Sequence, residues 1–307
     1  MTVAQPEIGM VGIGRMGLPI ARHFIAAGRK VVGYRRSDGE AFAAAGGMRL
    51  RSPADVFARA PVIITCLPDA DALRQVIAGD DGFLSSGARG RIVIDVSTTD
   101  LATRNDLRSR LKSAGSTLID CPISGIPPVL ERRKAVFFAS CDRAEFDSVA
   151  PLLNILSDEI HYVGPFGAGT KMKYFANFLL AIHVAATAEV LAAATAAGLD
   201  PVQTVELLGK GAGGSFQLTS RGPLMAQKLF GSAHADLGGL AGDLALIAPF
   251  ASSLGLESHL LASAKALIDK SEALGFAHCD PAALIEVVQQ SMHGGAKTQT
   301  LQHAGND

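Results

Sequence analysis

Two lysines, Lys171 and Lys173, stand at the start of a long apolar segment, within GPFGAGTKMKYFANFLLAI at 164–182. A lysine can exchange a proton with an alcohol or carbonyl oxygen when burial lowers its pKa toward neutrality. On a helix, residues two apart point about 200° away from each other, so only one lysine can face a given cleft. Lys173 shares its face with the polar Asn177 one turn on. This geometry favours Lys173 and Asn177 as a catalytic pair, against the alternative that both lysines extend to solvent.

A glycine-rich turn near the N-terminus is suited to holding phosphate groups. Gly12, Gly14 and Gly17 form a GxGxxG pattern that follows an apolar run and opens an amphipathic segment. Glycines let the backbone approach a pyrophosphate, and the N-terminus of the following helix offers free N–H groups. In this context the pattern predicts a dinucleotide site that includes Arg15 and Met16, rather than an ordinary glycine turn.

The residues after the next β-rich run bear on the choice of cofactor. NAD-binding domains usually place an acidic residue there to bind the ribose 2′-hydroxyl. This chain has Arg35, Arg36 and Ser37, which suit a 2′-phosphate through charge-assisted hydrogen bonds. Asp38 and Glu40 follow closely, so NAD remains the alternative. We predict NADPH/NADP+ as the cofactor.

The elements that must position these motifs alternate along the first half of the chain. Apolar β-rich runs lie at 7–12, 30–34, 62–67, 91–96, 116–121, 135–140 and 160–164. Helical periodicity separates most of them, for example at 15–27, 69–78 and 100–113. Short apolar strands alternating with helices predict an α/β domain with a mostly parallel sheet that is covered on both faces.

The second half of the chain has a different pattern. After Gly164 the β signal stops, and Ala- and Leu-rich segments follow, with Asp200 and Asp280 each placed before a proline as helix N-caps. This pattern predicts an all-helical region entered through one long helix of about 30 residues. We expect an NADP(H)-binding domain over 1–164, a helical substrate and oligomerisation domain over 165–292, and a flexible tail over 293–307.

Composition restricts the partners. The 307 residues carry a formal net charge of −1, which gives no attraction to nucleic acid or to an anionic membrane. The apolar segment 174–197 includes polar and acidic residues, which favours a buried helix over a membrane span. Four cysteines without a CxxC pair, and no clustered His or acidic spacing, predict no metal site and no disulfides. Without a signal peptide pattern, we expect a cytoplasmic protein.

Several stretches together resemble one enzyme family. They are GIGRMGLPIARHFIAAG after the first β-rich run, VIITCLPD at 62–69, VIDVSTTD at 93–100, DCPISG at 120–125 and GAGTKMKYFAN at 167–177. In this order they are similar to the motifs of the β-hydroxyacid dehydrogenases. That family includes 3-hydroxyisobutyrate dehydrogenase, tartronate semialdehyde reductase and glyoxylate/succinic semialdehyde reductases. The resemblance covers nearly the whole chain.

The resemblance implies a fold and a set of residue roles. It implies a Rossmann-like N-terminal domain and a 6-phosphogluconate dehydrogenase-like helical C-terminal domain joined by a long helix, with a homodimer or homotetramer built through the helical part. Lys173 is then the catalytic lysine and Asn177 its partner. Residues near the nicotinamide and the reacting centre are Leu67, Pro68, Ser97 and Thr98, and the substrate-binding residues are Ser97, Ser124, Gly125, Ile126 and Asp243.

The chain departs from the family pattern around the expected substrate. Ile126 stands where the family usually has a second glycine, and two prolines follow it. Ala235 replaces a bulky Phe, and Gly242 before Asp243 replaces a lysine. These changes predict a roomier pocket with one cation fewer, suited to a bulkier or less acidic substrate.

These observations predict an NADP(H)-dependent oxidoreductase that transfers a hydride between the nicotinamide and a small-molecule alcohol or carbonyl compound. The substrate would be a β-hydroxyacid or a semialdehyde-like compound. One alternative is an imine reductase of the same architecture, which the pocket departures favour and the retained lysine disfavours. A non-catalytic dinucleotide-binding regulatory protein is the other, and the intact Lys173–Asn177 pair disfavours it.

Overall fold

The computed structural model describes residues 7–231 and 234–300, with 293–300 described by their backbone alone. The described chain forms two compact units, the first ending at Lys173 and the second beginning at Tyr174. The boundary falls inside one continuous helix, α8 (Ala168–Ala196).

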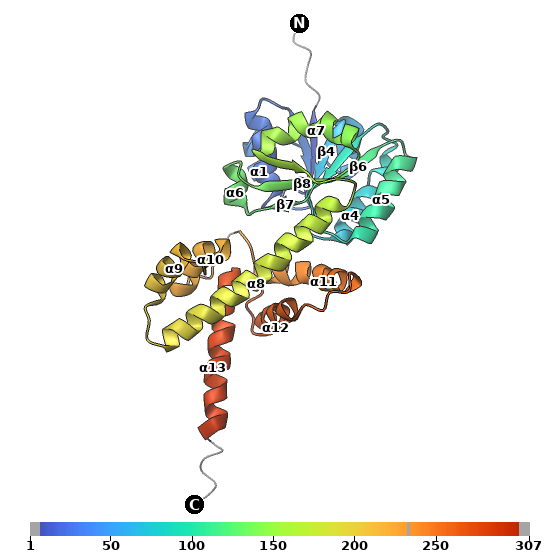
Figure 1. The fold of residues 1–307 in the computed structure, drawn as a ribbon. Helices are drawn as coiled ribbons and strands as arrows, with labels where there is room; N and C mark the ends of the chain where they lie inside the picture. Colours follow the sequence, from blue (N-terminus) through green and yellow to red (C-terminus); the bar gives the residue numbers. More distant parts are fainter. Residues whose placement is uncertain (1–6, 232–233, 301–307) are drawn as a thin grey trace, which may run out of the picture. The chain divides into compact units, whose positions relative to one another are not determined.

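The first unit is built on a parallel six-stranded sheet in the order β3-β2-β1-β4-β5-β6 (Figure 1). Its strands are β1 (Ile8–Val11), β2 (Val31–Tyr34), β3 (Met48–Arg49), β4 (Val62–Thr65), β5 (Ile92–Asp95) and β6 (Thr117–Asp120). The strand order reverses between β1 and β4. In open α/β sheets, ligands bind outside the carboxyl ends of the strands at such a reversal.

A smaller sheet accompanies the first one, in the order β7-β8-β9. It consists of β7 (Ile123–Ser124), β8 (Val136–Ala139) and β9 (Glu159–Tyr162), with β7 antiparallel and β9 parallel to β8. A single antiparallel bridge between Asp120 and Ser140 connects the end of β6 to the residue after β8. The end of β6 therefore meets both sheets.

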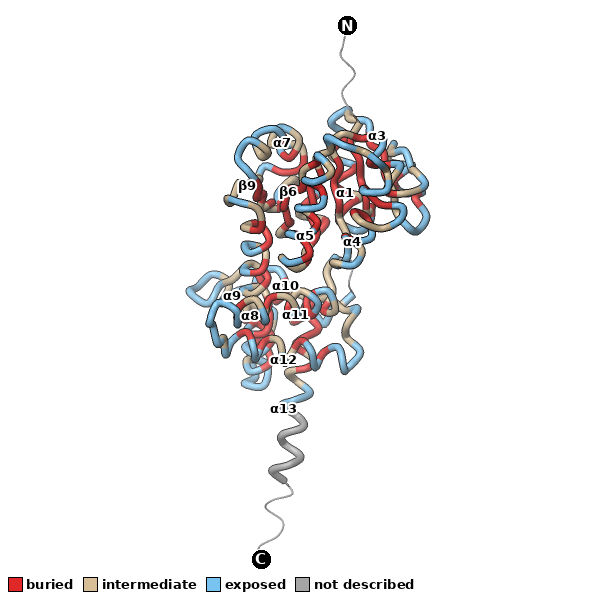
Figure 2. The backbone as a smooth tube through the Cα atoms, turned by 90° about the vertical axis from the view of Figure 1, so that its right-hand side faces the viewer, coloured by how far each residue is buried: buried red, intermediate tan, exposed pale blue. Residues whose placement is uncertain are grey.

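Both faces of the large sheet are buried, as its continuous apolar strands predict. In β1, Met10 packs into a core shared with Phe24 of α1 (Gly17–Ala26) and Leu153 of α7 (Arg143–Leu156). The next residue, Val11, packs into a separate core with helices on the opposite face, namely α3 (Pro53–Arg59), α4 (Ala70–Ala78) and α5 (Leu101–Ser113). Figure 2 shows these strands as the buried interior of the unit.

The remaining elements of the first unit are short. They are α2 (Glu40–Ala44), the 3-10 helix η1 (Leu84–Ser86) and α6 (Pro127–Glu131). The seven predicted β-rich runs correspond to β1, β2, β4, β5, β6, β8 and β9. The sequence did not indicate β3 and β7, because a two-residue strand is too short to show an alternating pattern.

The second unit is helical throughout its described residues. After α8 come α9 (Pro201–Lys210), α10 (Phe216–Ala226), α11 (Leu237–Ser253), α12 (His259–Ala273), the 3-10 helix η2 (Pro281–Ala283) and α13 (Leu284–Thr300). Asp200 and Asp280 act as the predicted N-caps, each ahead of a proline, at α9 and η2. The α/β fold with an all-helical second half, entered through a 29-residue helix, is confirmed.

Two sequence expectations concern α8 and the C-terminus. By length and composition α8 is the one helix in the described part of the chain that could cross a membrane, a test that core helices of water-soluble proteins also pass. The flexible tail expected over 293–307 overlaps α13, which continues to Thr300. Residues 301–307 lie outside the described residues.

Candidate active site

In the turn after β1, two of the three glycines lie very close to neighbouring backbone. Gly12 has a φ of +91°, and a Cβ there would lie 2.1 Å from the carbonyl oxygen of Cys66. A Cβ on Gly17, the first residue of α1, would lie 2.1 Å from the carbonyl oxygen of Gly12. A Cβ on Gly14 would meet no described atom within 4 Å. Two glycines thus let strand and helix close together, and the third leaves open space beside a helix N-terminus, where an anion is favoured.

A pocket of about 840 Å³ opens at the carboxyl ends of β1, β2 and β4. It brings together seven of the predicted cofactor-binding residues: Gly12, Gly14, Arg35, Arg36, Ser37, Leu67 and Pro68. Its apolar walls include Val11, Ile13, Tyr34 and Val76. The pocket lies where the strand order reverses, and its size and glycine-lined floor fit a nicotinamide dinucleotide.

The other predicted cofactor residues are not among those that line the pocket. Arg15 is exposed, and Met16 precedes α1 and packs against the apolar core. Gly17 is buried under the turn, where its role is the close approach described above. Thr98 is half-buried in the loop after β5.

The end of β2 presents the basic residues to the pocket. Arg35 donates from Nε and Nη2 to Ser37 Oγ at 3.0 and 2.6 Å, and Arg49 donates to the Ser37 carbonyl oxygen at 3.2 Å. Arg36 is exposed at the pocket wall. Asp38 accepts a hydrogen bond from a backbone N–H at 3.2 Å. Arg35 from the turn and Arg49 from β3 therefore order the backbone and side chain of Ser37, and Arg36 lines the pocket beside them.

Sequence reasoning missed an acidic side of the same pocket. Asp69, Asp71, Asp80 and Asp81 line it, opposite in charge to the arginines. Asp69 is the N-cap of α4, and Asp71 pairs with Arg74 at 2.5 Å. The positions of Asp69 and Asp71 were accessible from the sequence, because they follow the predicted strand at 62–67 and adjacent parallel strands end at one edge of a sheet. Asp80 and Asp81 come after α4, and the strand pattern does not indicate their place in the pocket.

Cys66 also lines this pocket. Burial, with a smaller contribution from the charge of Asp95, raises the pKa of its thiol to about 12. The thiolate, not the thiol, is the nucleophile. At neutral pH Cys66 is therefore an uncharged part of the wall.

The two lysines of α8 differ in burial. Lys171 is exposed, whereas Lys173 is half-buried. One turn beyond Lys173, Asn177 is 5% exposed and its Nδ2 donates to Asp243 Oδ2 on α11 at 2.5 Å. A carboxylate can only accept, so this bond fixes the Asn177 amide with its nitrogen toward Asp243. Asp243, predicted as a substrate-binding residue, thus orients the predicted partner of the lysine.

Ser97, predicted to contact substrate, is 4% exposed, and its hydroxyl is engaged within the protein. It donates to Asp95 Oδ1 at 2.6 Å and accepts from the Leu67 N–H at 2.9 Å. Its hydroxyl therefore supports the backbone of Leu67 at the pocket wall. Thr98, the next residue, is the more accessible hydroxyl of the two.

The predicted substrate residues begin with Ser124, the last residue of β7. Ser124 is half-buried, and Gly125 is exposed with a φ of +153°, a conformation that L side chains rarely adopt. Ile126 is half-buried and is the N-cap residue of α6. Pro127 and Pro128 occupy the first turn of this helix, where backbone N–H groups have no helical acceptor. The prolines therefore cost the loop no helical hydrogen bond while they remove two N–H donors.

The positions that depart from the family pattern in the second unit are small residues. Gly242 is exposed on α11, and a Cβ there would meet no described atom within 4 Å. Ala235 is half-buried just before the Asp236 cap of the same helix. At Gly242, next to Asp243, the chain therefore has open space at the position where the family pattern has a lysine.

Two family models together match most of the chain. The model described as the NAD binding domain of 6-phosphogluconate dehydrogenase matches residues 7–164. The model described as NAD-binding of NADP-dependent 3-hydroxyisobutyrate dehydrogenase matches residues 167–288. Glyoxylate/succinic semialdehyde reductase 2 of Arabidopsis thaliana is 27% identical over 92% of this chain and 79% of its own length. 2-(Hydroxymethyl)glutarate dehydrogenase of Eubacterium barkeri is 27% identical over 94% of this chain and 98% of its own.

Solved structures show the same fold. 3-Hydroxyisobutyrate dehydrogenase from Salmonella typhimurium has a TM-score of 0.84 at 24% identity, covering 92% of this chain and 100% of that one. An imine reductase from Myxococcus stipitatus in complex with NADP+ has a TM-score of 0.63 at 18% identity, covering 92% and 100%. The chain belongs to the β-hydroxyacid dehydrogenase family and is an NAD(P)-dependent oxidoreductase of the 3-hydroxyisobutyrate dehydrogenase-like type.

Proposed function

We propose that this protein is an NADP(H)-dependent reductase and dehydrogenase that interconverts a carbonyl compound and its alcohol, with Lys173 as the acid/base. The substrate is a β-hydroxyacid or a semialdehyde-like compound. The observation that carries the proposal is a half-buried Lys173 one turn before a buried Asn177, whose amide is fixed by Asp243 at 2.5 Å.

The first unit supplies the cofactor site. The turn from Gly12 to Gly17 would hold the pyrophosphate, because the open space at Gly14 adjoins a helix N-terminus. Leu67 and Pro68, with Thr98 beyond them, would lie beside the nicotinamide. The bound cofactor supplies the hydride in reduction and accepts it in oxidation.

The end of β2 supports a 2′-phosphate and hence NADP(H) over NAD. Arg36 lines the pocket, and Ser37 is held in place by two N–H groups of Arg35. A planar guanidinium can bind a phosphate through two hydrogen bonds. On the acidic side, the Asp69 carboxylate already caps α4, and the Asp71 carboxylate already pairs with Arg74.

Lys173 carries the proton transfer. In reduction, the carbonyl oxygen gains negative charge as its carbon is reduced, and the Lys173 ammonium donates a proton to it. In oxidation, the neutral amine accepts the hydroxyl proton. Because Asp243 holds Nδ2 of Asn177, the amide oxygen is turned away from Asp243 and can accept a hydrogen bond from the ammonium or from the substrate hydroxyl.

The substrate loop and α11 favour a bulkier or less acidic substrate than a small hydroxyacid. Ile126 and the two prolines add volume and remove N–H donors near Ser124. Open space surrounds the Cβ position of Gly242, where a lysine would have supplied a cation for a carboxylate. Substitution Gly242→Lys should therefore shift preference toward the more acidic substrates of a panel.

An imine reductase is the second candidate. The same departures at Ile126, Ala235 and Gly242 favour a bulky, uncharged substrate, and the fold is shared with an imine reductase. The lysine at 173 favours carbonyl chemistry, because an alkoxide needs a proton donor of this kind.

A substrate panel separates these functions. Purified protein is assayed with NADPH against succinic semialdehyde, glyoxylate, a longer aldehyde acid and a cyclic imine, and with NADP+ against 3-hydroxyisobutyrate and 2-(hydroxymethyl)glutarate. We expect turnover of at least one aldehyde or hydroxyacid and none of the imine. Turnover of the imine alone would assign the second candidate. Tight NADPH binding without turnover of any compound would support a non-catalytic dinucleotide-binding protein.

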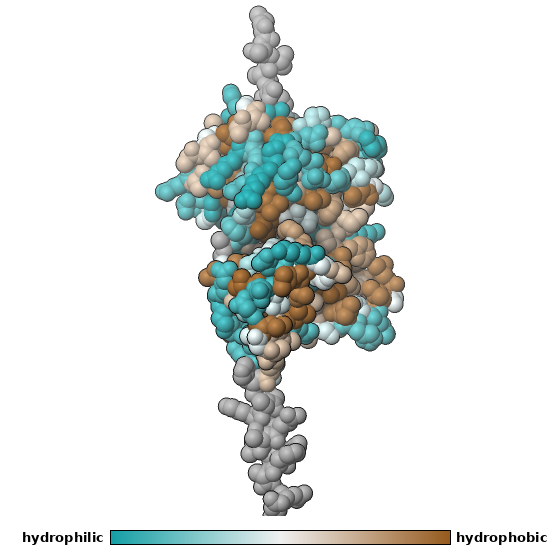
Figure 3. Space-filling model, turned by 60° about the vertical axis from the view of Figure 1, so that its left-hand side comes forward, coloured by the Kyte–Doolittle hydropathy of each residue, from teal (hydrophilic) through white to brown (hydrophobic). Residues whose placement is uncertain are grey.

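The helical unit would carry self-association. It exposes large apolar side chains, among them Phe216 at 70%, Leu260 at 67% and Leu199 at 58%. Figure 3 shows hydrophobic surface on the visible face of this unit. Exposed apolar surface of this kind marks an interface, and we infer a cytoplasmic homodimer or homotetramer. Light scattering coupled to gel filtration tests this inference, and a monomer at micromolar concentration would contradict it.

A further inference from the structure

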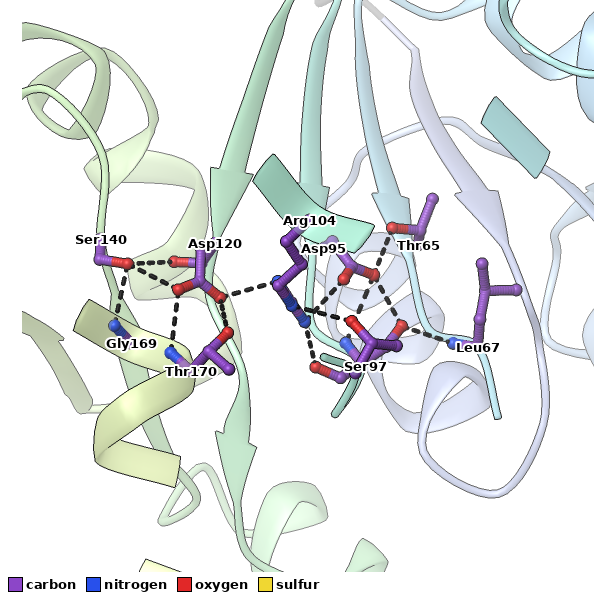
Figure 4. Close-up of polar contacts among 10 residues, drawn as sticks. Thr65, Leu67, Asp95, Ser97, Arg104, Asp120, Ser140, Gly169 and Thr170 are labelled. Carbon is purple, nitrogen blue, oxygen red and sulfur yellow. Dashed lines mark hydrogen bonds and ion pairs between the residues drawn. The ribbon is translucent and has the colours of Figure 1, made fainter. Parts of the chain in front are cut away.

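A fully buried arginine lies at the centre of the first unit. Arg104, on α5, and the carboxylates of Asp95 and Asp120 at the ends of β5 and β6 all have 0% exposure. Arg104 Nη1 lies 2.7 Å from Asp120 Oδ1, and Nη2 lies 2.7 Å from Asp95 Oδ2. Figure 4 shows the guanidinium between the two carboxylates. One side chain thus links the ends of two neighbouring strands.

One arm of this cluster leads to the cofactor pocket. Asp95 Oδ1 accepts from Thr65 Oγ1 at 2.7 Å and from Ser97 Oγ at 2.6 Å. Ser97 Oγ in turn accepts from the N–H of Leu67, which lines the pocket. Arg104 also donates to the backbone carbonyl oxygen of Ser97. This arm therefore fixes the two loops that form the wall expected beside the nicotinamide.

The other arm leads to the first turn of α8. Asp120 accepts from the Thr170 N–H at 2.9 Å and from Thr170 Oγ1 at 2.8 Å. Ser140 donates to Asp120 Oδ2 at 2.8 Å and accepts from the Gly169 N–H at 2.9 Å. These bonds satisfy N–H groups that have no acceptor inside the helix. A carboxylate at a helix N-terminus is also favoured by the helix dipole.

The anchored turn directly precedes the one that carries Lys173. Gly169 and Thr170 precede Lys173 by four and three residues, so they lie on the neighbouring turn of the same face. A Cβ on Gly169 would lie 2.2 Å from the carbonyl oxygen of Phe138, so the helix backbone touches the end of β8 there. The position of this turn is thus set by direct contact as well as by hydrogen bonds.

We propose that Asp120 and Arg104 are positioning residues for the reaction: Asp120 fixes the first turn of α8, one turn before Lys173, and Arg104 couples that turn to the Ser97–Leu67 wall of the cofactor pocket. A buried ionic cluster is weak evidence for stability, because apolar residues of similar volume often replace one without loss. It does define geometry, because on one arm its bonds reach the backbone of Leu67 and Ser97 beside the expected nicotinamide site. On the other arm they reach the backbone N–H groups of Gly169 and Thr170, one helical turn before Lys173. The proposal rests on the proposed acid/base role of Lys173.

Thr170→Val tests the arm at α8 without leaving a buried charge unpaired at Arg104. It removes only the hydroxyl donor to Asp120, and Thr170→Ser restores it. The matched control is Ser157→Ala, another buried hydroxyl of the same unit, which donates to the carbonyl oxygens of Arg133 and Ala135 at 2.9 and 2.6 Å. All three are measured in the full chain for thermal stability, NADPH affinity, kcat and the pH dependence of kcat, with the best substrate of the panel.

We expect Thr170→Val to lower kcat about tenfold to a hundredfold and to shift its pH profile, with NADPH affinity within about twofold of wild type. Thr170→Ser should recover kcat to within about threefold, and Ser157→Ala should lose stability while it keeps kcat and the pH profile. Equal losses of kcat in Thr170→Val and Ser157→Ala, or no recovery in Thr170→Ser, would overturn the role of Asp120.

The coupling through Arg104 is tested by a double-mutant cycle with Thr65→Val on the far arm. The effects of Thr65→Val and Thr170→Val on kcat should be non-additive by at least about threefold. Additivity within about twofold would overturn the coupling.

If wild type turns over no compound, the proposed function fails and amide hydrogen exchange decides the present proposal. Thr170→Val should then speed exchange over 168–173 about tenfold relative to wild type and to Ser157→Ala, and unchanged exchange would overturn it.

Discussion

The cofactor turn and the first turn of α8 are both helix N-termini at the carboxyl edge of the sheet, yet they are built differently. The cofactor turn is shaped by its backbone: Gly12 and Gly17 lie so close to neighbouring carbonyl oxygens that neither position has room for a Cβ. The first turn of α8 is held by the side chains of Asp120 and Ser140, and Arg104 pairs with Asp120 behind them. The first adjoins open space, because a Cβ on Gly14 would meet no described atom within 4 Å, whereas the Gly169 and Thr170 N–H groups of the second bond to side chains of the protein. We therefore propose that a helix N-terminus is a binding site in one case and an anchor in the other.

The difference between the two helix N-termini should appear most strongly when glycines of the cofactor turn are substituted. Gly12→Ala places a Cβ against the Cys66 carbonyl oxygen at a positive φ, so we expect loss of NADPH binding and a loss of about 3 kcal/mol or more of unfolding free energy. The new Cβ of Gly14→Ala would meet no described atom, so the unfolding free energy should stay within about 0.5 kcal/mol of wild type. The same Cβ would occupy the open space expected to hold the pyrophosphate, so NADPH binding should weaken. NADPH fluorescence titration and urea unfolding measure both. Equal stability losses would show that the turn is not shaped by its backbone.

The lysine helix should respond in turnover rather than in cofactor binding. Asp243→Ala removes the acceptor that holds the Asn177 amide, and we expect kcat to fall about tenfold while NADPH affinity is retained. Asp269→Ala on α12, which removes an exposed carboxylate paired with Lys265, is the control and should keep kcat. Steady-state kinetics of the two variants decide. A change in NADPH affinity with unchanged kcat in Asp243→Ala would reverse the assignment.

Arg36 tests the cofactor side alone. Arg36→Ala should lower the preference for NADPH over NADH, as the ratio of kcat/KM values, by about tenfold, because a charge-assisted contact to the 2′-phosphate is lost. Arg51→Ala removes another exposed arginine and should leave the ratio unchanged. If the Arg36→Ala ratio stays at the wild-type value, the 2′-phosphate is bound elsewhere or is not bound.

The smallest effect concerns Cys66 in the pocket wall. Its pKa in the folded protein is about 12, against 9.0 as the ordinary value, so only the unfolded thiol ionises between these values. Stability from the protonated Cys66 thiol is therefore complete well below pH 9 and decreases above it, by about 1 kcal/mol per pH unit. Between pH 8 and pH 10, wild type should lose about 1 kcal/mol more unfolding free energy than Cys66→Ala. Parallel losses in urea unfolding would show that Cys66 does not remain protonated.

The same contrast explains what the sequence could predict. The glycine spacing and the strand–helix alternation predicted the cofactor turn. The turn depends on residues that are close together in the chain, so its requirements can be read from a short stretch of sequence. The anchor of α8 was missed, because Arg104, Asp120 and Thr170 are far apart in the chain and meet only through the sheet. Arg104 was not recognised as buried, since charged residues on a polar helix ordinarily face solvent. Substrate binding by Ser97 stays a prediction; what the sequence could not indicate is that its hydroxyl bonds to Asp95 and to the N–H of Leu67.

We propose that Lys173, and not Lys171, transfers the proton. The direct test measures kcat for Lys173→Ala and Lys171→Ala with NADPH and the best aldehyde of the panel, together with NADPH affinity. Lys173→Ala should lower kcat about a hundredfold to ten-thousandfold with NADPH affinity retained, and Lys171→Ala should stay within about twofold of wild type. Near-normal turnover by Lys173→Ala, or a comparable loss in Lys171→Ala, would contradict the account.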